Sequence, residues 1–192
     1  MGADKVPDTF FDNPTYDRFE TLVSDIAAQD ERGRDEVAAD LYREIEDRVP
    51  QRRLPRNEYE EAVDDLVDQA SDYDPDAVVG INRGGNPLAT ALSYRLDVSY
   101  GTVDATHYDG KQQLDEVSID GEMLHNVEGD VLLADNLADT GKTLEAVRKE
   151  LDGRDDIDQI RTATLHRKPH SQVTPDYYVD DVIAWIVYPW ED

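Results

Sequence analysis

Hydroxyl and amide groups suited to binding an anion are concentrated at residues 139–143, directly after a short apolar run at residues 131–134. The apolar run is typical of a strand inside a parallel sheet, and Leu144, Val147 and Leu151 then repeat at helical spacing. The turn therefore lies where a strand ends and a helix begins, a place where main-chain N–H groups and the helix dipole attract anions. Its threonine hydroxyls, and a glycine that lets the backbone approach a ligand, predict a site for a sugar phosphate.

Two known phosphate-binding motifs resemble this turn. The Gly-Lys-Thr triplet at 141–143 fits the end of the nucleotide-triphosphate P-loop, but the first glycine of that motif would fall at Asn136, which excludes it. The segment instead resembles the phosphoribosyl diphosphate (PRPP) motif of the type I phosphoribosyltransferases, which has an apolar strand, two adjacent acidic residues and a D-T-G-x-T loop. One position departs from that motif, because Asp135 is followed by an amide rather than by a second carboxylate.

This resemblance implies a role for each residue of the motif. The implied 5-phosphate site consists of Asp139, Thr140, Gly141, Lys142 and Thr143, and the implied ribose site consists of Asp135 and Asn136. The implied catalytic residues are Asp135, near the cationic sugar that forms when pyrophosphate leaves, and Asp139, which faces the imidazole edge of the base in purine members and handles a proton there. Mg²⁺ is the implied cofactor, with Asp135 as an indirect or substrate-mediated ligand, because this ion keeps most of its waters.

A second glycine-rich loop, Arg83-Gly84-Gly85, follows an apolar strand at residues 77–81. Its main-chain amides are expected at the same rim of the sheet as the turn at residues 139–143, called the phosphate turn below. An Arg-Gly-Gly triplet alone is usually only a turn. Beside the PRPP motif it resembles the S-R-G-G loop of the family, which implies that Arg83, Gly84 and Gly85 bind pyrophosphate. The resemblance also implies a cis peptide bond between Arg83 and Gly84.

Two C-terminal segments resemble the base-recognition parts of purine phosphoribosyltransferases. Residues 164–169 match a strand end that places a lysine, here Lys168, against the exocyclic oxygen of the base. Residues 185–191 resemble the W-I-x-x-P-W-[DE] ending of the xanthine-guanine branch, so Trp185 would stack on the base and main-chain groups near Ile186 would read its edge. The alternative for Trp185 is an ordinary core aromatic residue on a final strand.

The implied function is purine salvage: transfer of ribose 5-phosphate from PRPP to hypoxanthine, guanine or xanthine, among which the sequence does not choose. Adenine or a pyrimidine is disfavoured because Lys168 is a donor suited to an oxo group. The amide at Asn136 leaves open a PRPP- or nucleotide-sensing regulator on the same fold, with weak or no catalysis. A scaffold protein with an empty site is a third hypothesis.

The elements that position these loops alternate between strands and helices from residue 77 onward, which predicts an α/β fold with a mostly parallel twisted sheet flanked by helices. Residues 1–56 are expected to form a helical N-terminal extension, and residues 57–192 a phosphoribosyltransferase domain that ends in the base-recognition segment. Helices are expected at 15–29, 34–48 and 57–71, and strands at 77–81, 98–106, 131–135, 160–165 and 182–187.

Three further segments give weaker expectations. Residues 107–129 are long for a connection and are expected to form a lid over the site, a role compatible with a β-hairpin. His166 and His170 have the spacing of a helical zinc pair, but Pro169 between them argues against a helix, so we expect loop or surface residues. The basic segment around Arg52 is more often a solvated surface than an anion site.

The composition is strongly acidic: 45 acidic against 19 basic residues give a formal net charge of -26. This charge makes nucleic acid an unfavourable partner, and the small number of lysines resembles proteins of haloarchaea. No cysteine is present, which excludes disulfides and thiolate chemistry. Without a membrane-spanning apolar stretch or a signal-peptide pattern, we expect a cytoplasmic protein, with the homodimer or higher homo-oligomer usual in the family.

We predict that the protein is unstable at low salt, because the repulsion among its carboxylates is screened only at high ionic strength. Thermal unfolding followed over a series of potassium chloride concentrations should show a midpoint that falls as the salt is removed. A midpoint independent of salt would contradict this prediction.

Overall fold

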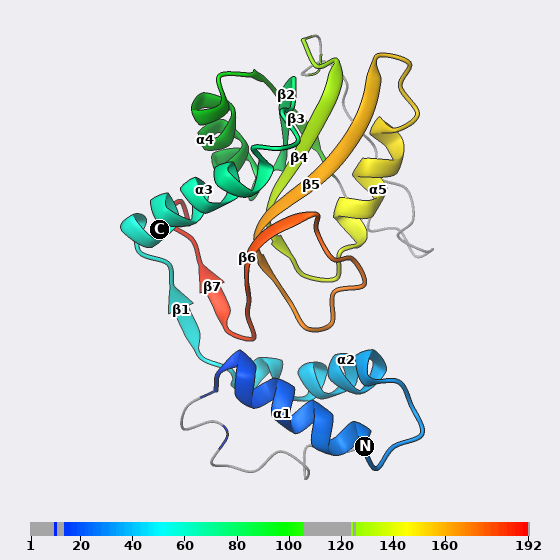
Figure 1. Ribbon diagram of the computed structural model, residues 1–192. Helices are drawn as coiled ribbons and strands as arrows, with labels where there is room; N and C mark the ends of the chain where they lie inside the picture. The colour runs from blue at the N-terminus through cyan, green and yellow to red at the C-terminus, as the bar shows by residue number, and fades with distance from the viewer. Residues whose placement is uncertain (1–9, 11–13, 106–123, 125, 192) are drawn as a thin grey trace.

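A five-stranded parallel sheet forms the centre of the computed structural model, which describes residues 10, 14–105, 124 and 126–191 (Figure 1). The strand order is β3-β2-β4-β5-β6, and all four neighbouring pairs are parallel. The strands are β2 (Ala77–Asn82), β3 (Ser99–Asp104), β4 (Gly129–Ala138), β5 (Ile157–Arg167) and β6 (Tyr177–Asp181). The predicted fold class is confirmed, whereas most of the expected lid at 107–129 lies outside the described residues.

Helices cover both faces of this sheet (Figure 1). α3 (Arg56–Ala70) and α4 (Asn86–Leu96) pack on one face, and α5 (Lys142–Leu151) packs on the other. Successive residues of a strand therefore enter different cores: Leu132 of β4 lies with α3 and α4, and Leu133 lies with α5. Because both faces are buried, the central strands are continuous apolar runs, which is why they could be located in the sequence.

The register of the strands brings three loops to one edge of the sheet. Gly80 of β2 lies beside Ala134 of β4, and Ala138 of β4 lies beside Arg167 of β5. The carboxyl ends of β2, β4 and β5 are therefore neighbours, and the chain leaves each of them toward the same side. In open parallel sheets this edge is where ligands bind.

The strand expected at 182–187 is wrong as a member of the main sheet. The edge position beside β5 is already filled by β6, and the chain then turns away before β7 (Trp185–Val187). β7 instead pairs in parallel with β1 (Gln51–Arg53) in a separate two-stranded sheet, so the basic segment around Arg52 is a short exposed strand. An apolar run alone does not distinguish these two pairings, because it records burial and not the partner strand.

The N-terminal part of the chain forms a pair of helices, α1 (Tyr16–Ala27) and α2 (Arg34–Ile45), followed by a 3-10 turn at Glu46–Arg48. The helices pack against each other through a core that includes Phe19 and Ile45, and Ile183 of the C-terminal segment joins this core. The helical pair therefore contacts the segment expected to recognise the base. Within the described part of the chain, none of the helices has the length and apolar character required to span a membrane.

We predict that Leu132→Ala lowers the free energy of unfolding by about 2–5 kcal/mol, because it leaves a cavity beneath α3 and α4 in the central strand. Urea denaturation at constant potassium chloride concentration measures the change. Leu22→Ala on α1, where the leucine is only partly buried, is the matched control and should cost clearly less. Equal losses in the two variants would contradict the position of Leu132 in the core.

Candidate active site

The phosphate turn joins β4 to α5 and has the geometry of an anion cradle. Gly141 precedes α5 with φ of +78°, and a Cβ atom placed on it would lie 2.7 Å from Cβ of Val173, so the position requires glycine. The main chain of Thr140 is fixed by the Gln172 N–H group, which donates to its carbonyl at 3.0 Å. The turn lines a cavity of about 380 Å³ into which the amino end of α5 opens.

The second glycine-rich loop joins β2 to α4 and lies directly against the end of β4. A Cβ atom on Gly84 would lie 2.4 Å from the side-chain oxygen of Asn136, and one on Gly85 would lie 2.8 Å from Cα of Asp135. Both glycines are thus required by close packing. The cis peptide bond is between Asn82 and Arg83, so its expected location one bond later is wrong. The structure brings the two loops expected to bind pyrophosphate and ribose into contact.

Asp135 lies at the centre of this arrangement, between the two anion-binding loops. Its carboxylate accepts a hydrogen bond from the N–H group of Asn136 at 2.8 Å. Burial raises the pKa of Asp135 to about 7, and the hydrogen bond opposes the shift only in part. The raised pKa brings the titration of this carboxyl into the physiological pH range, and a cation that forms beside it would favour the ionised carboxylate.

The expected base-binding lysine is buried behind the phosphate turn. Lys168 follows β5, its N–H group donates to the carbonyl of Ala138 at 3.0 Å, and its side chain is 3% exposed. Its ammonium donates to the main-chain oxygens of Ile183 (3.1 Å) and Ala184. Burial lowers the pKa of Lys168 to about 8, while Asp139 and Glu46 act in the opposite direction. The ammonium is thus held in place by acceptors and still has a third proton for a ligand.

Asp139 is paired with His170, whose Nε2 lies 3.0 Å from a carboxylate oxygen. The hydrogen bond from His170 holds the pKa of Asp139 below its usual range, with the charge of Lys168 as a smaller contribution. The imidazole of His170 is itself stacked on the ring of Tyr42 at 4.6 Å. His170 lies in the turn after β5, as expected of a loop residue, and it also contacts the site through Asp139.

His166, expected on the surface or in a loop, is instead buried on β5 at 4% exposure. Burial lowers the pKa of His166 to about 4, so its ring is neutral at pH 7. Its Nδ1 lies 3.0 Å from the hydroxyl of Tyr188, and that hydroxyl donates to the carbonyl of Asn136 at 3.0 Å. The expectation failed because the residue continues a strand that is longer than the apolar run, 160–165, from which it was predicted.

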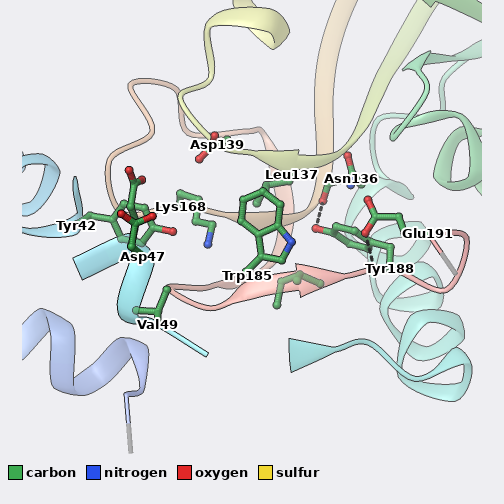
Figure 2. A pocket seen from close by; sticks show the side chains of 12 residues that line it. Tyr42, Asp47, Val49, Asn136, Leu137, Asp139, Lys168, Trp185, Tyr188 and Glu191 are labelled. Carbon is green, nitrogen blue, oxygen red and sulfur yellow. Dashed lines mark hydrogen bonds between the residues drawn. The ribbon is translucent and has the colours of Figure 1, made fainter. Parts of the chain in front are cut away.

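Trp185 is on the short strand β7 and is 64% exposed, which excludes the core alternative. Its ring faces a cavity of about 330 Å³ between the phosphate turn and the N-terminal helices (Figure 2). Ile186 also lines this cavity. Next to it, the Trp185 N–H group donates to Pro50 at 3.2 Å and the Val187 carbonyl accepts from Leu54 at 2.9 Å, so these two main-chain groups are already used by the β1 segment.

Three cavities meet along the edge of the sheet. The cavity beside Trp185 shares Leu137 and Asp139 with the cavity of the phosphate turn, and it shares Glu191 with a cavity of about 740 Å³ beside Arg83 and Gly84. The sequence did not indicate the other lining residues Tyr42, Glu46, Asp47, Val49, Tyr188 and Glu191 as site residues.

Two glycine-rich loops beside one carboxylate at the edge of a parallel sheet, next to a cavity lined by a lysine, suit a transferase that acts on phosphorylated ribose. The phosphoribosyl transferase domain model matches residues 55–191. Because that match covers most of the chain, the protein belongs to the phosphoribosyl transferase domain family and is an enzyme of the glycosyltransferase type.

Named relatives agree with this family. The xanthine-guanine phosphoribosyltransferase of Cereibacter sphaeroides is 33% identical over 121 residues, which cover 60% of this chain and 68% of the relative. The crystal structure of purine phosphoribosyltransferase from Pyrococcus horikoshii is 34% identical with a TM-score of 0.62, covering 74% of this chain and 95% of that chain. The Helicobacter pylori xanthine-guanine-hypoxanthine phosphoribosyltransferase is 27% identical with a TM-score of 0.65, covering 73% and 94%.

We predict that His170→Ala raises the pKa of Asp139 toward the ordinary range, since the variant removes the hydrogen bond that contributes most to the shift. A titration followed by carboxyl ¹³C NMR measures this pKa. Ser171→Ala, which leaves the imidazole in place, is the control and should have no effect. An unchanged titration of Asp139 in the His170 variant would show that the pair does not form in solution.

Proposed function

We propose that the protein is a purine salvage enzyme that transfers ribose 5-phosphate from PRPP to a 6-oxopurine, releasing pyrophosphate and a nucleoside monophosphate. The observation that carries this proposal is the position of Lys168, a buried ammonium that opens into the cavity beside Trp185 and close to Asp139. A cavity lined by the exposed ring of Trp185 and by one fixed cationic donor suits a heterocycle with an oxo group, since an amino group would leave the donor without an acceptor. The names of the relatives, which act on xanthine, guanine or hypoxanthine, support the same substrates.

The residues expected to bind PRPP are proposed in the same roles. The 5-phosphate would occupy the turn from Asp139 to Thr143, and the pyrophosphate would lie against Arg83, Gly84 and Gly85. Asp135 and Asn136 lie between these two loops, where the ribose has to be placed to connect the two phosphate groups. Each loop precedes the amino end of a helix, α5 or α4, which favours negative charge.

The reaction then follows from the charges around the ribose. As the bond from C1 to pyrophosphate breaks, positive charge develops on the sugar and negative charge on the leaving group. Ionised Asp135 would stabilise the sugar cation, and the main-chain amides of the second loop would stabilise the pyrophosphate. Asp139, kept ionised by His170, would accept the proton that the attacking purine nitrogen has to lose.

We propose Mg²⁺ as the cofactor, held mainly by the substrate. Among the described residues, no group of three or more histidine and carboxylate side chains is arranged to hold a metal ion. A single carboxylate, Asp135, between the two loops fits an ion that keeps its waters and substrate oxygens as ligands. When bound, the ion would neutralise the charge that develops on the pyrophosphate.

We also propose the division of the chain into an N-terminal extension, 1–56, and a transferase domain, 57–192, which the start of the family match at residue 55 supports. A homodimer or larger homo-oligomer and a cytoplasmic location are proposed from the family resemblance.

The direct test is nucleotide formation in molar potassium chloride with magnesium and PRPP, in which hypoxanthine, guanine, xanthine, adenine and uracil are offered separately. Chromatography of the products should show nucleotide with at least one 6-oxopurine and little with adenine or uracil. Folded protein that binds PRPP but forms no nucleotide with any base would favour the second candidate, a PRPP- or nucleotide-sensing regulator, for which the amide of Asn136 is the supporting observation.

We predict that kcat/KM for PRPP falls about tenfold per pH unit below pH about 7, where Asp135 becomes protonated and loses its charge. The pKa is raised, so the ionised form is present only above it, and activity is lost as the pH decreases. Asp135→Asn should remove this limb of the profile and lower the rate at pH 8. Asp158→Asn, which changes an exposed carboxylate on β5, is the control and should keep the limb. If the acid limb persists in the Asp135 variant, the limb belongs to the titration of another group.

We predict that Asn136→Asp preserves or raises turnover, because it restores a second carboxylate beside the sugar cation without a change of size. The size matters, because position 136 is in close contact with Gly84. Steady-state kinetics and PRPP binding by calorimetry measure the effect. Loss of PRPP binding in this variant would refute the placement of residue 136 beside the ribose.

A further inference from the structure

The N-terminal helical pair supplies one wall of the base cavity. The cavity that Asp139 of the phosphate turn lines is also lined by Tyr42 of α2, together with Glu46, Asp47 and Val49 just beyond it. These residues lie before residue 55, where the match to the family model begins. This wall is thus a feature of this chain that the family match does not account for.

Tyr42 fixes this wall to the residues proposed to bind the base. Its hydroxyl donates to the carbonyl of Ile183 at 3.2 Å, which also accepts a hydrogen bond from Lys168. Its ring stacks on His170 with an interplanar angle of 19° and lies 5.1 Å from the Lys168 ammonium. The tyrosine is 4% exposed, so α2 is held against the cavity by apolar packing as well as by these polar contacts.

The position of the wall determines which edge of a purine it faces. In Figure 2, Asn136 and Glu191 lie at one end of the cavity, Tyr42 and Asp47 lie at the other, and Trp185 is between them. The ribose has to lie at the Asn136 end, so the six-membered ring of the base points toward Asp47. With the 6-oxo group directed at Lys168, the ring atoms left to face the wall are N1 and the substituent at position 2.

We propose that Glu46 and Asp47 read the 2-position of the base and make the enzyme favour guanine over xanthine. This inference rests on the proposed function of the site. Carboxylates accept hydrogen bonds, and guanine offers two donors on this edge, the N1–H and the 2-amino group. Xanthine has an oxo group at position 2, which cannot donate a hydrogen bond to a carboxylate and is left without a partner. It also loses a ring proton near neutral pH, and the resulting anion is repelled by the carboxylates of Glu46 and Asp47.

The charge balance of the cavity supports the same preference. Besides two tyrosines, the ionisable side chains that line it are one ammonium, Lys168, and four carboxylates: Glu46, Asp47, Asp139 and Glu191. Asp139 is already in contact with His170 at 3.0 Å, and Glu191 accepts a hydrogen bond from the Tyr188 N–H group at 2.9 Å. Glu46 and Asp47 are both exposed, so their carboxylates are available to a ligand.

The test compares three bases in the wild type and in the double variant Glu46→Gln, Asp47→Asn. Hypoxanthine, which needs Lys168 but has no 2-substituent, is the internal reference. Relative to hypoxanthine, kcat/KM for xanthine should increase about tenfold in the double variant and that for guanine should decrease several-fold, since each amide can donate to an oxo group. Each single variant should give part of the change.

The matched control is the double variant Asp35→Asn, Glu36→Gln, which removes the same charge from the first turn of α2, outside the cavity. It should leave both ratios to hypoxanthine, that for xanthine and that for guanine, unchanged. Ratios within twofold of the wild type in the test variant, or an equal change in the control, would overturn the proposal. The second result would assign the effect to the net charge of the helical pair.

Equilibrium binding of the nucleotides IMP, GMP and XMP, measured by calorimetry, separates this inference from the proposed function. The wild type should bind GMP more tightly than XMP, and the double variant should reduce this difference. Absence of turnover with every 6-oxopurine would refute the proposed function alone. Equal affinities for GMP and XMP in the wild type would refute the inference, whether or not the enzyme turns over.

Discussion

Burial of both faces of a parallel sheet is the constraint on which the site depends. Parallel strands have to be connected by crossovers, and here α3 and α4 cover one face while α5 covers the other. All strands then end at one edge, so the loops after β2, β4 and β5 meet without any specific attraction between them. The site is a consequence of how the core is closed, and the polar residues have only to be placed one or two positions beyond the last buried side chain.

Close packing at that edge explains why the loops contain glycine. Gly84 and Gly85 lie against Asn136 and Asp135, and Gly141 lies against Val173, at distances that leave no room for a Cβ atom. Gly84 and Gly85 bring two main chains together beside the partly buried carboxylate of Asp135, and burial at this contact raises its pKa. The geometry and the electrostatics of the site therefore have a single physical origin.

The sequence predicted the elements that are determined by neighbouring residues, and it missed the contacts between segments that are far apart in the chain. The strand, turn and helix around Gly141 could be located because apolar periodicity and turn chemistry occur within about twenty residues. The pairing of β7 with β1, the contact of Tyr42 with Ile183 and the partnership of His170 with Asp139 could not, since each joins segments whose own patterns fit several partners. Tyr42 was expected only to belong to an amphipathic helix, and nothing in the helical period indicates that its ring covers a lysine.

The pairing of β1 with β7 joins two segments that are far apart in the chain, so the parts of the site become complete at different times during synthesis. The contacts of the phosphate turn are complete once the segment after β5, through Val173, has left the ribosome, because Gln172 and Val173 contact Thr140 and Gly141. The cavity beside Trp185 also needs Trp185 and Glu191, which follow this segment in the chain, together with Tyr42, which precedes it. During synthesis the contacts of the phosphate turn can therefore form before this cavity is complete.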